Sequence, residues 1–154
     1  MQSMVRKVWW VLTAIWAVII FNLSGASCSS ASSGRLLSMI FNWLSISVLP
    51  QTLDRLNFLL RKTAHLSEYA ILAMILYHSI KPADDRSWSR RSAFVALLVS
   101  GIYSLTDEFH QVFVPGRHAS LYDCLLDTTG AFLGLLLLSS VILALRHGAS
   151  PQAA

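Results

Sequence analysis

Residues 121–145 read LYDCLLDTTGAFLGLLLLSSVILAL, and this stretch decides the fold class. Its charged side chains, Asp123 and Asp127, lie near its start, and the remainder is mostly apolar. A helix needs about 20 mostly apolar residues to cross the hydrocarbon core of a bilayer. The stretch therefore predicts a transmembrane helix, and it indicates an all-α, polytopic membrane protein instead of a soluble globular domain.

The composition of the whole chain agrees with a lipid environment. Hydrophobic residues make up 55% of the 154 residues and charged residues 13%, whereas an ordinary soluble domain has about 25% charged residues. The formal net charge is +4. The basic residues form no stripe with interleaved aromatic residues, so we expect no nucleic-acid partner. Cys28 and Cys124 lack CxxC spacing and are expected to be free thiols, with a disulfide as the alternative in an oxidising compartment.

Three other apolar stretches have the composition of membrane spans. Residues 8–21 predict a retained first transmembrane helix, with a cleaved signal peptide as the alternative. Residues 56–80 and 93–114 are long enough to cross the bilayer, although ionisable residues interrupt each of them. With residues 121–145, these stretches predict about four transmembrane helices in a single domain that covers residues 1–154.

The segment between the first two spans differs in composition. Residues 22–34 are rich in Ser, Gly and Ala and predict a loop. Residues 35–49 are apolar but too short to span comfortably, and Pro50 is expected to close them. We therefore predict a short interfacial helix between the first and second transmembrane helices.

The orientation of the chain follows from its basic residues. One membrane side holds Arg6, Lys7, Lys81, Arg86, Arg90, Arg91 and Arg146, and the other holds Arg35, Arg55, Arg61, Lys62 and Arg117. Short loops with excess Lys and Arg face the cytoplasm. The excess on the first side predicts that both termini are cytoplasmic.

The ionisable residues inside the spans form the candidate site. The second span begins, the third ends and the fourth begins on the same membrane side, so their polar residues converge there. At about 1.5 Å per residue, His65, Asp107 and Asp127 lie roughly 10 to 14 Å from their helix ends. These residues therefore predict a polar pocket sunk into the outer half of the membrane, and intramembrane ionisable groups are functional by default.

Helical spacing places these side chains on one stripe of each span. The stripes hold Arg61, His65 and Glu68 with Tyr69 beside them; Tyr103, Asp107 and His110 with Gln111 adjacent; and Asp123, Asp127, Gly130 and Gly134. A structural explanation stands beside the functional one. The basic residues could pair with Glu68, Glu108 and Asp123 to hold the helices together, and the two glycines are typical of close helix packing.

The polar residues of the last three spans also match a known pattern. They read Arg61-Lys62-x-x-His65-x-x-Glu68-Tyr69, then Asp107-Glu108-Phe109-His110-Gln111-x-Phe113-x-Pro115-Gly116-Arg117-x-x-Ser120, then Asp123-x-x-x-Asp127-x-x-Gly130-Ala131-x-x-Gly134. This pattern, over about residues 61–134, resembles the VanZ-like family of membrane proteins. The first span and the Ser-rich segment lie outside the resemblance.

The resemblance implies a multi-helix protein of the bacterial inner (cytoplasmic) membrane, with these polar residues as its signature. The family's namesake is linked to resistance against the glycopeptide antibiotic teicoplanin, which acts on cell-wall precursors. One departure matters, because Asp127 stands where the pattern usually has Asn. The departure adds a carboxylate to the site and makes its charge balance less typical.

A first functional hypothesis is that the protein binds or remodels a lipid-linked anionic headgroup. Its partner would be a membrane lipid or a lipid-linked cell-wall precursor, and Arg117 could grip a phosphate bidentately. The ligand-binding candidates are Arg61, Lys62, Tyr69, Gln111, Arg117, Asp123 and Asp127. Five carboxylates against three cations would repel a phosphate unless some are protonated or a metal intervenes.

Two other hypotheses belong to different classes. A membrane hydrolase or transferase would bind a divalent metal such as zinc or iron through His65, Glu68, Asp107 and His110. Acid–base hydrolysis without a metal would use His65 or His110 as the base, and Glu108 completes the catalytic candidates. A small proton-coupled transporter is the third hypothesis, because carboxylate and histidine chains mark proton relays. Four spans are few for a transporter, so this hypothesis implies a homo-oligomer.

Overall fold

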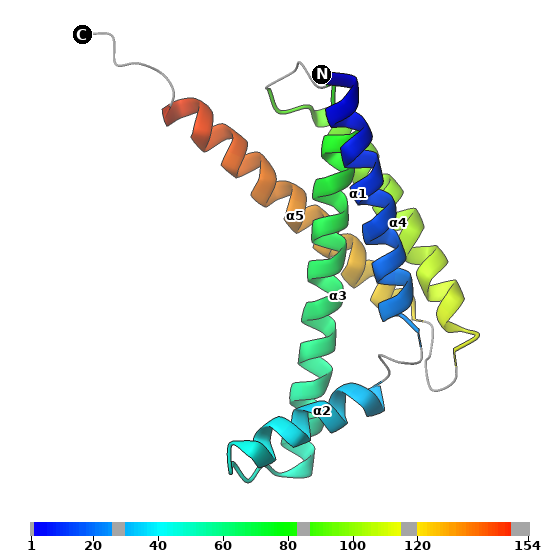
Figure 1. Cartoon of the computed structure of the whole chain (residues 1–154), viewed down its shortest axis with the longest axis vertical. Helices are drawn as coiled ribbons and strands as arrows, with labels where there is room; N and C mark the ends of the chain where they lie inside the picture. Colours follow the sequence, from blue (N-terminus) through cyan, green and yellow to red (C-terminus); the bar gives the residue numbers. More distant parts are fainter. Residues whose placement is uncertain (1, 26–29, 83–86, 115–119, 149–154) are drawn as a thin grey trace.

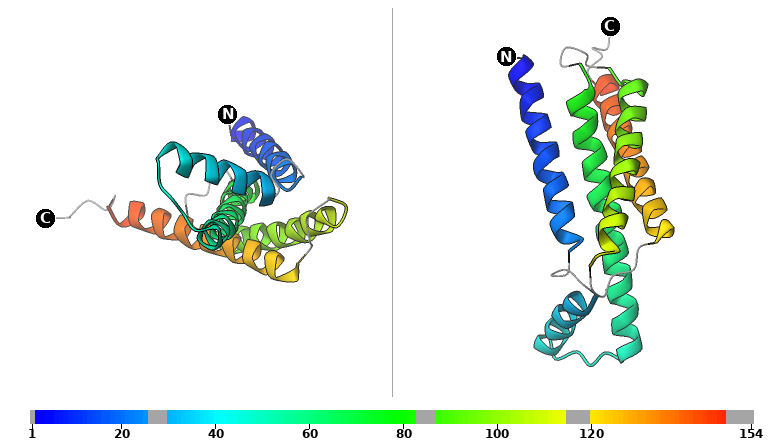
Figure 2. Two further views of the ribbon diagram at one scale, coloured as in Figure 1. Left: turned by 90° about the horizontal axis from the view of Figure 1, so that it is seen from below. Right: turned by 90° about the vertical axis from the view of Figure 1, so that its right-hand side faces the viewer.

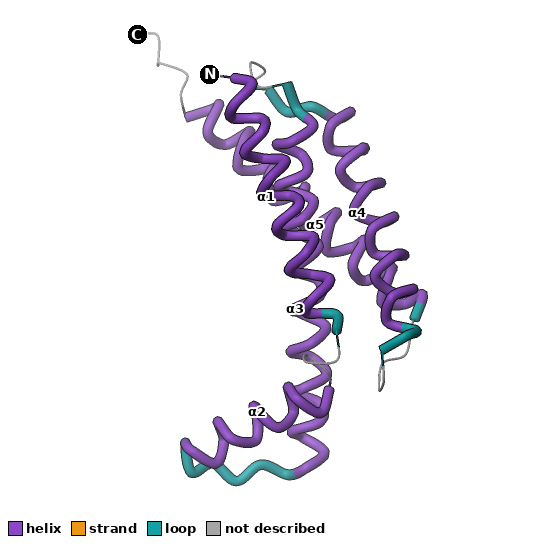
Figure 3. The backbone as a smooth tube through the Cα atoms, turned by 45° about the vertical axis from the view of Figure 1, so that its right-hand side comes forward, coloured by secondary structure: helices purple, strands orange, loops and turns teal. Residues whose placement is uncertain are grey.

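Helix α3 (Pro50–Ile80) is the axis around which the other helices pack. The computed structural model of the protein describes residues 2–25, 30–82, 87–114 and 120–148. Within them, α1 (Gln2–Leu23), α4 (Arg90–Gln111) and α5 (Leu121–Gly148) surround the C-terminal part of α3. Helix α2 (Ser30–Trp43) lies beside the N-terminal part of α3, beyond the ends of α1 and α4 (Figure 1 and Figure 3). The start of α1 and the end of α5 lie at the same end of the structure (Figure 2).

Exposed apolar surface on the helices is typical of a protein that lies in a membrane. Three helices are long and apolar enough to cross a membrane among the described residues: Met4–Leu23, Arg90–Gln111 and Leu121–Arg146. Large apolar side chains such as Val11, Phe94 and Leu137 are exposed on them. The protein is therefore an all-helical membrane protein. Helix α3 is not among the three, and its sequence carries charged and polar residues between its apolar ones.

The structure differs from the sequence-based prediction in the region between α1 and α3. The predicted loop at residues 22–34 is wrong in part, because α2 begins at Ser30 and ends at Trp43. Ser45 has a φ of 57°, and Ile46 N donates to Phe41 O at 2.9 Å. This is a Schellman motif, in which a left-handed residue ends the helix by satisfying its last carbonyl groups.

Pro50 opens α3 instead of closing the preceding helix. A proline at the first helical position loses no hydrogen bond, because the N–H there has no partner within the helix. Helix α3 therefore extends over 31 residues, or about 46 Å at 1.5 Å per residue. That length exceeds the hydrocarbon core of a bilayer, which is about 30 Å thick. The N-terminal part of α3 thus has more length than a span requires.

The other helix ends differ little from the prediction. Helix α1 begins at Gln2, before the predicted residue 8, because the apolar pattern is preceded by residues that tolerate a helix. Ser89 caps α4 by accepting a hydrogen bond from Ser92 N at 3.2 Å. The predicted span of residues 93–114 ends earlier, at Gln111, where the chain continues into tighter turns.

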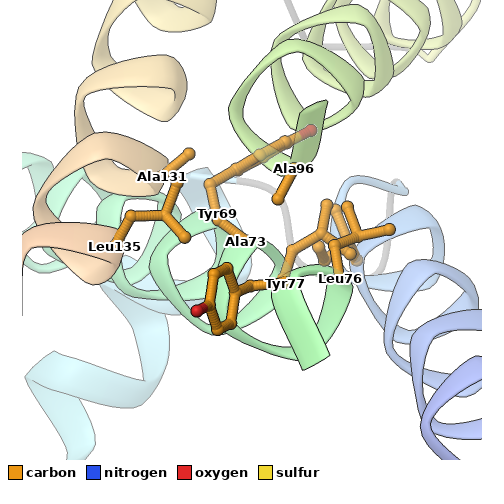
Figure 4. Packing of buried hydrophobic residues seen from close by; sticks show 9 residues of the cluster. Tyr69, Ala73, Leu76, Tyr77, Ala96, Ala131 and Leu135 are labelled. Atoms are coloured by element: carbon orange, nitrogen blue, oxygen red, sulfur yellow. The ribbon is translucent and has the colours of Figure 1, made fainter. Parts of the chain in front are cut away.

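The core lies around α3, where α1, α4 and α5 pack against it, and Ile20 is the fully buried contribution of α1. Tyr69, Ala73, Leu76 and Tyr77 of α3 pack against Ala96 of α4 and against Ala131 and Leu135 of α5 (Figure 4). Two glycines allow α5 to approach α3 closely. A Cβ atom at Gly130 would lie 2.2 Å from Leu66 O, and one at Gly134 would lie 2.6 Å from Ala70 O. The prediction that this pair is a packing face is confirmed.

Candidate functional site

A hollow lies where the end of α1, the start of α2 and the middle of α3 meet. Its volume is about 190 Å³, and it is lined by Leu23, Ser33, Leu60, Arg61, Ala64, His65 and Glu68. Residues 61, 65 and 68 lie on successive turns of α3, so their side chains leave the helix on the same face. The prediction that Arg61, His65 and Glu68 share one stripe of this helix is confirmed.

His65 connects the hollow to a buried polar cluster. Its Nδ1 atom lies 3.5 Å from Asp127 Oδ1 of α5, and Asp127 is fully buried. The Ser104 hydroxyl of α4 donates to Asp127 Oδ2 at 2.7 Å. Three helices therefore meet at this carboxylate.

The acidic residues at the end of α4 are held by neutral donors. The Ser24 hydroxyl donates to Asp107 Oδ2 at 2.7 Å. Gln111 Nε2 donates to Asp107 Oδ2 and to Glu108 Oε1, at 3.3 Å in each case. Ser120 N donates to Glu108 Oε2 at 2.7 Å. Asp107, Glu108 and Gln111 are all buried, so they form an internal polar network instead of a pocket wall.

Lys62 forms an ion pair with Asp123 between α3 and α5. This contact matches the structural explanation for the charged residues, which assigned some of them to holding the helices together. Both side chains are about a quarter exposed, so the pair lies at the edge of the buried cluster.

The other residues predicted for the pocket lie in different surroundings in the structure. Tyr69 is fully buried, points toward α4 (Figure 4) and is not among the residues that line the hollow. The Tyr103 hydroxyl donates to Ala17 O at 2.6 Å and thereby joins α4 to α1. The His110 ring lies 4.2 Å from the Phe21 ring, measured between centroids. Arg117 lies outside the described residues, and its role remains a prediction from the sequence.

Comparison with known proteins places this arrangement in a family. The model of the VanZ/LLP1 family matches residues 8–144, nearly the whole chain. The chain belongs to the VanZ/LLP1 family. The match takes in α1 and α2, which the resemblance over residues 61–134 did not include. No curated protein and no solved structure matches the chain.

The metal-ligand set predicted for this VanZ/LLP1 protein does not form a cluster. Among the residues that the structure describes, no three His, Cys, Asp or Glu side chains are placed to hold a metal ion together. His65 and Glu68 line the hollow, Asp107 belongs to the internal network, and His110 packs on Phe21. The divalent-metal hypothesis therefore stays a prediction without support from this arrangement.

Several residues of the VanZ/LLP1 site were not predicted from the sequence. Ser24 and Ser104 donate to the two buried aspartates, and Trp16 Nε1 donates to Glu68 O at 2.9 Å. The spacing of Ser104 from Asp107 and Gln111 places all three on one helix face, which was a usable signal. Ser24 lies in a Ser-rich segment that gives no comparable signal, because its contact with Asp107 bridges 83 residues.

Proposed function

We propose that this VanZ/LLP1 protein binds the phosphate-bearing headgroup of a membrane lipid or of a lipid-linked cell-wall precursor in the hollow. The observation that carries the proposal is the composition of the wall, where Arg61 lies beside Leu23, Leu60 and Ala64. A lipid headgroup next to its acyl chains requires such a combination of a cation and apolar surface. The guanidinium group is suited to phosphate because its donors match two phosphate oxygens at once.

The size of the hollow supports a headgroup as the ligand. A cavity of about 190 Å³ is smaller than the 300 to 1,000 Å³ that usually encloses a whole drug-sized ligand. It can hold a phosphate group and its immediate substituents, while the remainder of a lipid stays in the bilayer. Exposed apolar residues of α2 and of the first part of α3, such as Met39 and Phe58, offer contacts for acyl chains.

Most acidic residues of the spans lie outside the wall of the hollow, so a phosphate there would meet less repulsion than their number suggests. Asp107, Glu108 and Asp127 accept hydrogen bonds from Ser24, from Ser120 N and from Ser104 respectively. Asp123 pairs with Lys62. Glu68 is the carboxylate that lines the hollow itself, together with Arg61 and His65. The charge in the wall is thus more balanced than the acidic composition of the spans suggests.

The proposed topology places the hollow at the non-cytoplasmic side of the bacterial inner membrane. We take α3 as a transmembrane helix in addition to α1, α4 and α5, and α2 as an interfacial helix. The excess of Lys and Arg then places the start of α1 and the end of α5 on the cytoplasmic side. Both termini are then cytoplasmic. A ligand of the outer leaflet would reach Arg61 from beside α2. Binding of a cell-wall precursor at this position would link the protein to glycopeptide susceptibility.

The proposal is tested by titrating purified, full-length protein in detergent with short-chain phosphatidic acid, using short-chain diacylglycerol as the phosphate-free control. We expect Arg61→Gln to weaken phosphatidic acid binding at least about tenfold, which corresponds to 1.4 kcal/mol. Arg55→Gln is the matched control, because Arg55 is exposed on the same helix and does not line the hollow. Equal affinities of wild type and Arg61→Gln, or equal affinities for the two lipids, would contradict the proposal.

A further inference from the structure

Behind the hollow, α3, α4 and α5 bring together a cluster of buried oxygen atoms. The cluster consists of the Tyr69 and Ser104 hydroxyl groups and the Asp107 and Asp127 carboxylates. Tyr69, Ser104 and Asp127 are 0% exposed and Asp107 is 2% exposed. Neither Asp107 nor Asp127 lines the hollow, so the cluster is distinct from the proposed headgroup site.

Several buried oxygen atoms of this cluster accept no hydrogen bond from the protein. Each carboxylate accepts hydrogen bonds through its Oδ2 atom only. Asp107 Oδ1, Asp127 Oδ1 and the Tyr69 hydroxyl are buried and have no hydrogen-bond partner. Asp127 Oδ1 faces His65 Nδ1 at 3.5 Å, which is beyond the usual range of an N–H···O bond. Buried polar atoms are normally satisfied, so each of these oxygens requires an explanation.

The unpartnered atoms belong to one site. The charges of Asp107 and Asp127 both act on the Tyr69 hydroxyl, which also lies near the Ser104 hydroxyl. The two carboxylates also act on each other. Tyr69 extends from α3 toward α4, the helix that carries Ser104 and Asp107 (Figure 4). Oxygen atoms from three helices therefore lie in one buried region of the bundle, where the Ser104 hydroxyl of α4 contacts Asp127 of α5.

The charged groups around this cluster leave one negative charge uncompensated. Two carboxylates come from α4 and α5, and His65 faces Asp127 from α3. Lys62, one turn before His65 on α3, is paired with Asp123. A protonated His65 would balance one carboxylate, and one negative charge would remain in a low-dielectric setting where charge is costly. A hard, oxygen-ligated cation would remove that charge and satisfy the unpartnered oxygens at the same time.

We propose that Asp107, Asp127, Tyr69 and Ser104 bind a single sodium ion within the bundle. A transition metal is a poor match for this site, because its ligands are carboxylate and hydroxyl oxygens without a cluster of three His, Cys, Asp or Glu among the described residues. Glu108 is not counted as a ligand, because both of its oxygens already accept hydrogen bonds, from Gln111 Nε2 and Ser120 N. With a protonated His65 opposite the two aspartates, a monovalent ion completes the charge balance and a divalent ion would exceed it. This site does not depend on headgroup binding in the hollow.

The test is equilibrium binding of radioactive sodium to full-length protein in detergent, with choline chloride keeping the ionic strength constant. We expect saturable binding of a single sodium ion per chain. Asp107→Asn and Asp127→Asn should each weaken it at least about tenfold, because each removes a charged ligand. Asp54→Asn is the matched control, since Asp54 is exposed in the first turns of α3. Unchanged affinity in both site variants would overturn the proposal.

If the asparagine variants fail to fold, sodium binding to the wild type and to one conservative variant still tests the proposal. Tyr69→Phe keeps the buried ring and removes only the hydroxyl oxygen, so it should fold and bind sodium several-fold more weakly. Absence of saturable sodium binding to the wild type would overturn the proposal. Displacement of sodium by calcium at far lower concentrations than sodium itself requires would also overturn it, because the site would then be built for a divalent ion.

Discussion

His65 Nδ1 lies 3.5 Å from Asp127 Oδ1, which joins a residue in the wall of the hollow to the buried face of α5. Asp127 is itself held by the Ser104 hydroxyl at 2.7 Å. A change at Ser104 should therefore reach the hollow through two side chains, without contact between Ser104 and a ligand there. We therefore expect substitutions at Ser104 or Asp127 to change both the stability of the protein and ligand binding in the hollow.

Ser104→Ala should destabilise the protein, because it leaves a buried Asp127 oxygen without its donor. The expected loss is about 1 to 3 kcal/mol, the usual cost of an unsatisfied buried polar group. Thermal unfolding in detergent measures it. Ser67→Ala is the control, since the exposed Ser67 hydroxyl bonds only to the backbone of its own helix. Equal melting temperatures for the two variants would argue against a structural role for the Ser104–Asp127 bond.

Gly130→Ala should disrupt the contact of α5 with α3. The added Cβ would lie 2.2 Å from Leu66 O, and backbone on both sides leaves little freedom to relax. Overpacking of this kind costs about 1 to 3 kcal/mol. Gly101→Ala is the matched control, because its Cβ would lie 3.4 Å from the nearest atom, Thr128 Oγ1. A melting temperature of Gly130→Ala as high as that of Gly101→Ala would contradict the close packing.

The Lys62–Asp123 pair should show coupling in a double-mutant cycle. Both side chains are partly exposed, so we expect a coupling free energy near the upper end of surface pairs, about 0.5 to 1 kcal/mol. The cycle uses Lys62→Met, Asp123→Asn and the double variant, with unfolding as the measurement. Additive effects of the two substitutions would indicate that the pair adds nothing to the association of α3 and α5.

Arg117→Lys should lose most of the ligand binding while membrane insertion and folding stay intact. An arginine can contact two phosphate oxygens in one plane, and a lysine retains the charge without this geometry. Titration with phosphatidic acid and size-exclusion chromatography separate the two effects. Binding at the wild-type level in this variant would make Arg117 a topology or surface charge.

The divalent-metal hypothesis has a direct measurement. Protein purified without chelator is expected to contain less than about 0.1 equivalent of zinc or iron, because binding requires a complete ligand set. Stoichiometric metal that disappears in both His65→Ala and His110→Ala would reverse this expectation. Its affinity should then fall as the pH drops through the histidine range, since imidazole must be neutral to bind a metal.

The sequence predicted the positions of the long helices and the stripe of α3 that lines the hollow, because both depend on local periodicity. It did not predict how the stripes face one another. Tyr69 follows Glu68 directly, but one residue turns a helix by about 100°. Tyr69 therefore points toward α4, whereas Glu68 lines the hollow. Such rotations depend on packing between helices, and residue spacing within one helix carries no information about them.

The role of Pro50 was ambiguous for a different reason. A proline is compatible with the first turn of a helix and also with the residues just after a helix. The deciding feature is the left-handed Ser45, which ends α2 five residues earlier than Pro50. A serine gives no signal for this conformation, which glycine or asparagine usually provides. The boundary of α2 could therefore not be read from composition.

The contacts between α3 and α5 also limit how the chain can change in length. Lys62, His65, Leu66 and Ala70 meet Asp123, Asp127, Gly130 and Gly134 in order. Deleting one residue between Lys62 and Ala70 would rotate the following contacts by about 100° and shift them by about 1.5 Å. Insertions and deletions should thus be excluded from this part of α3 but accepted between Ile46 and Leu49, which lie between the end of the Schellman motif and the start of α3.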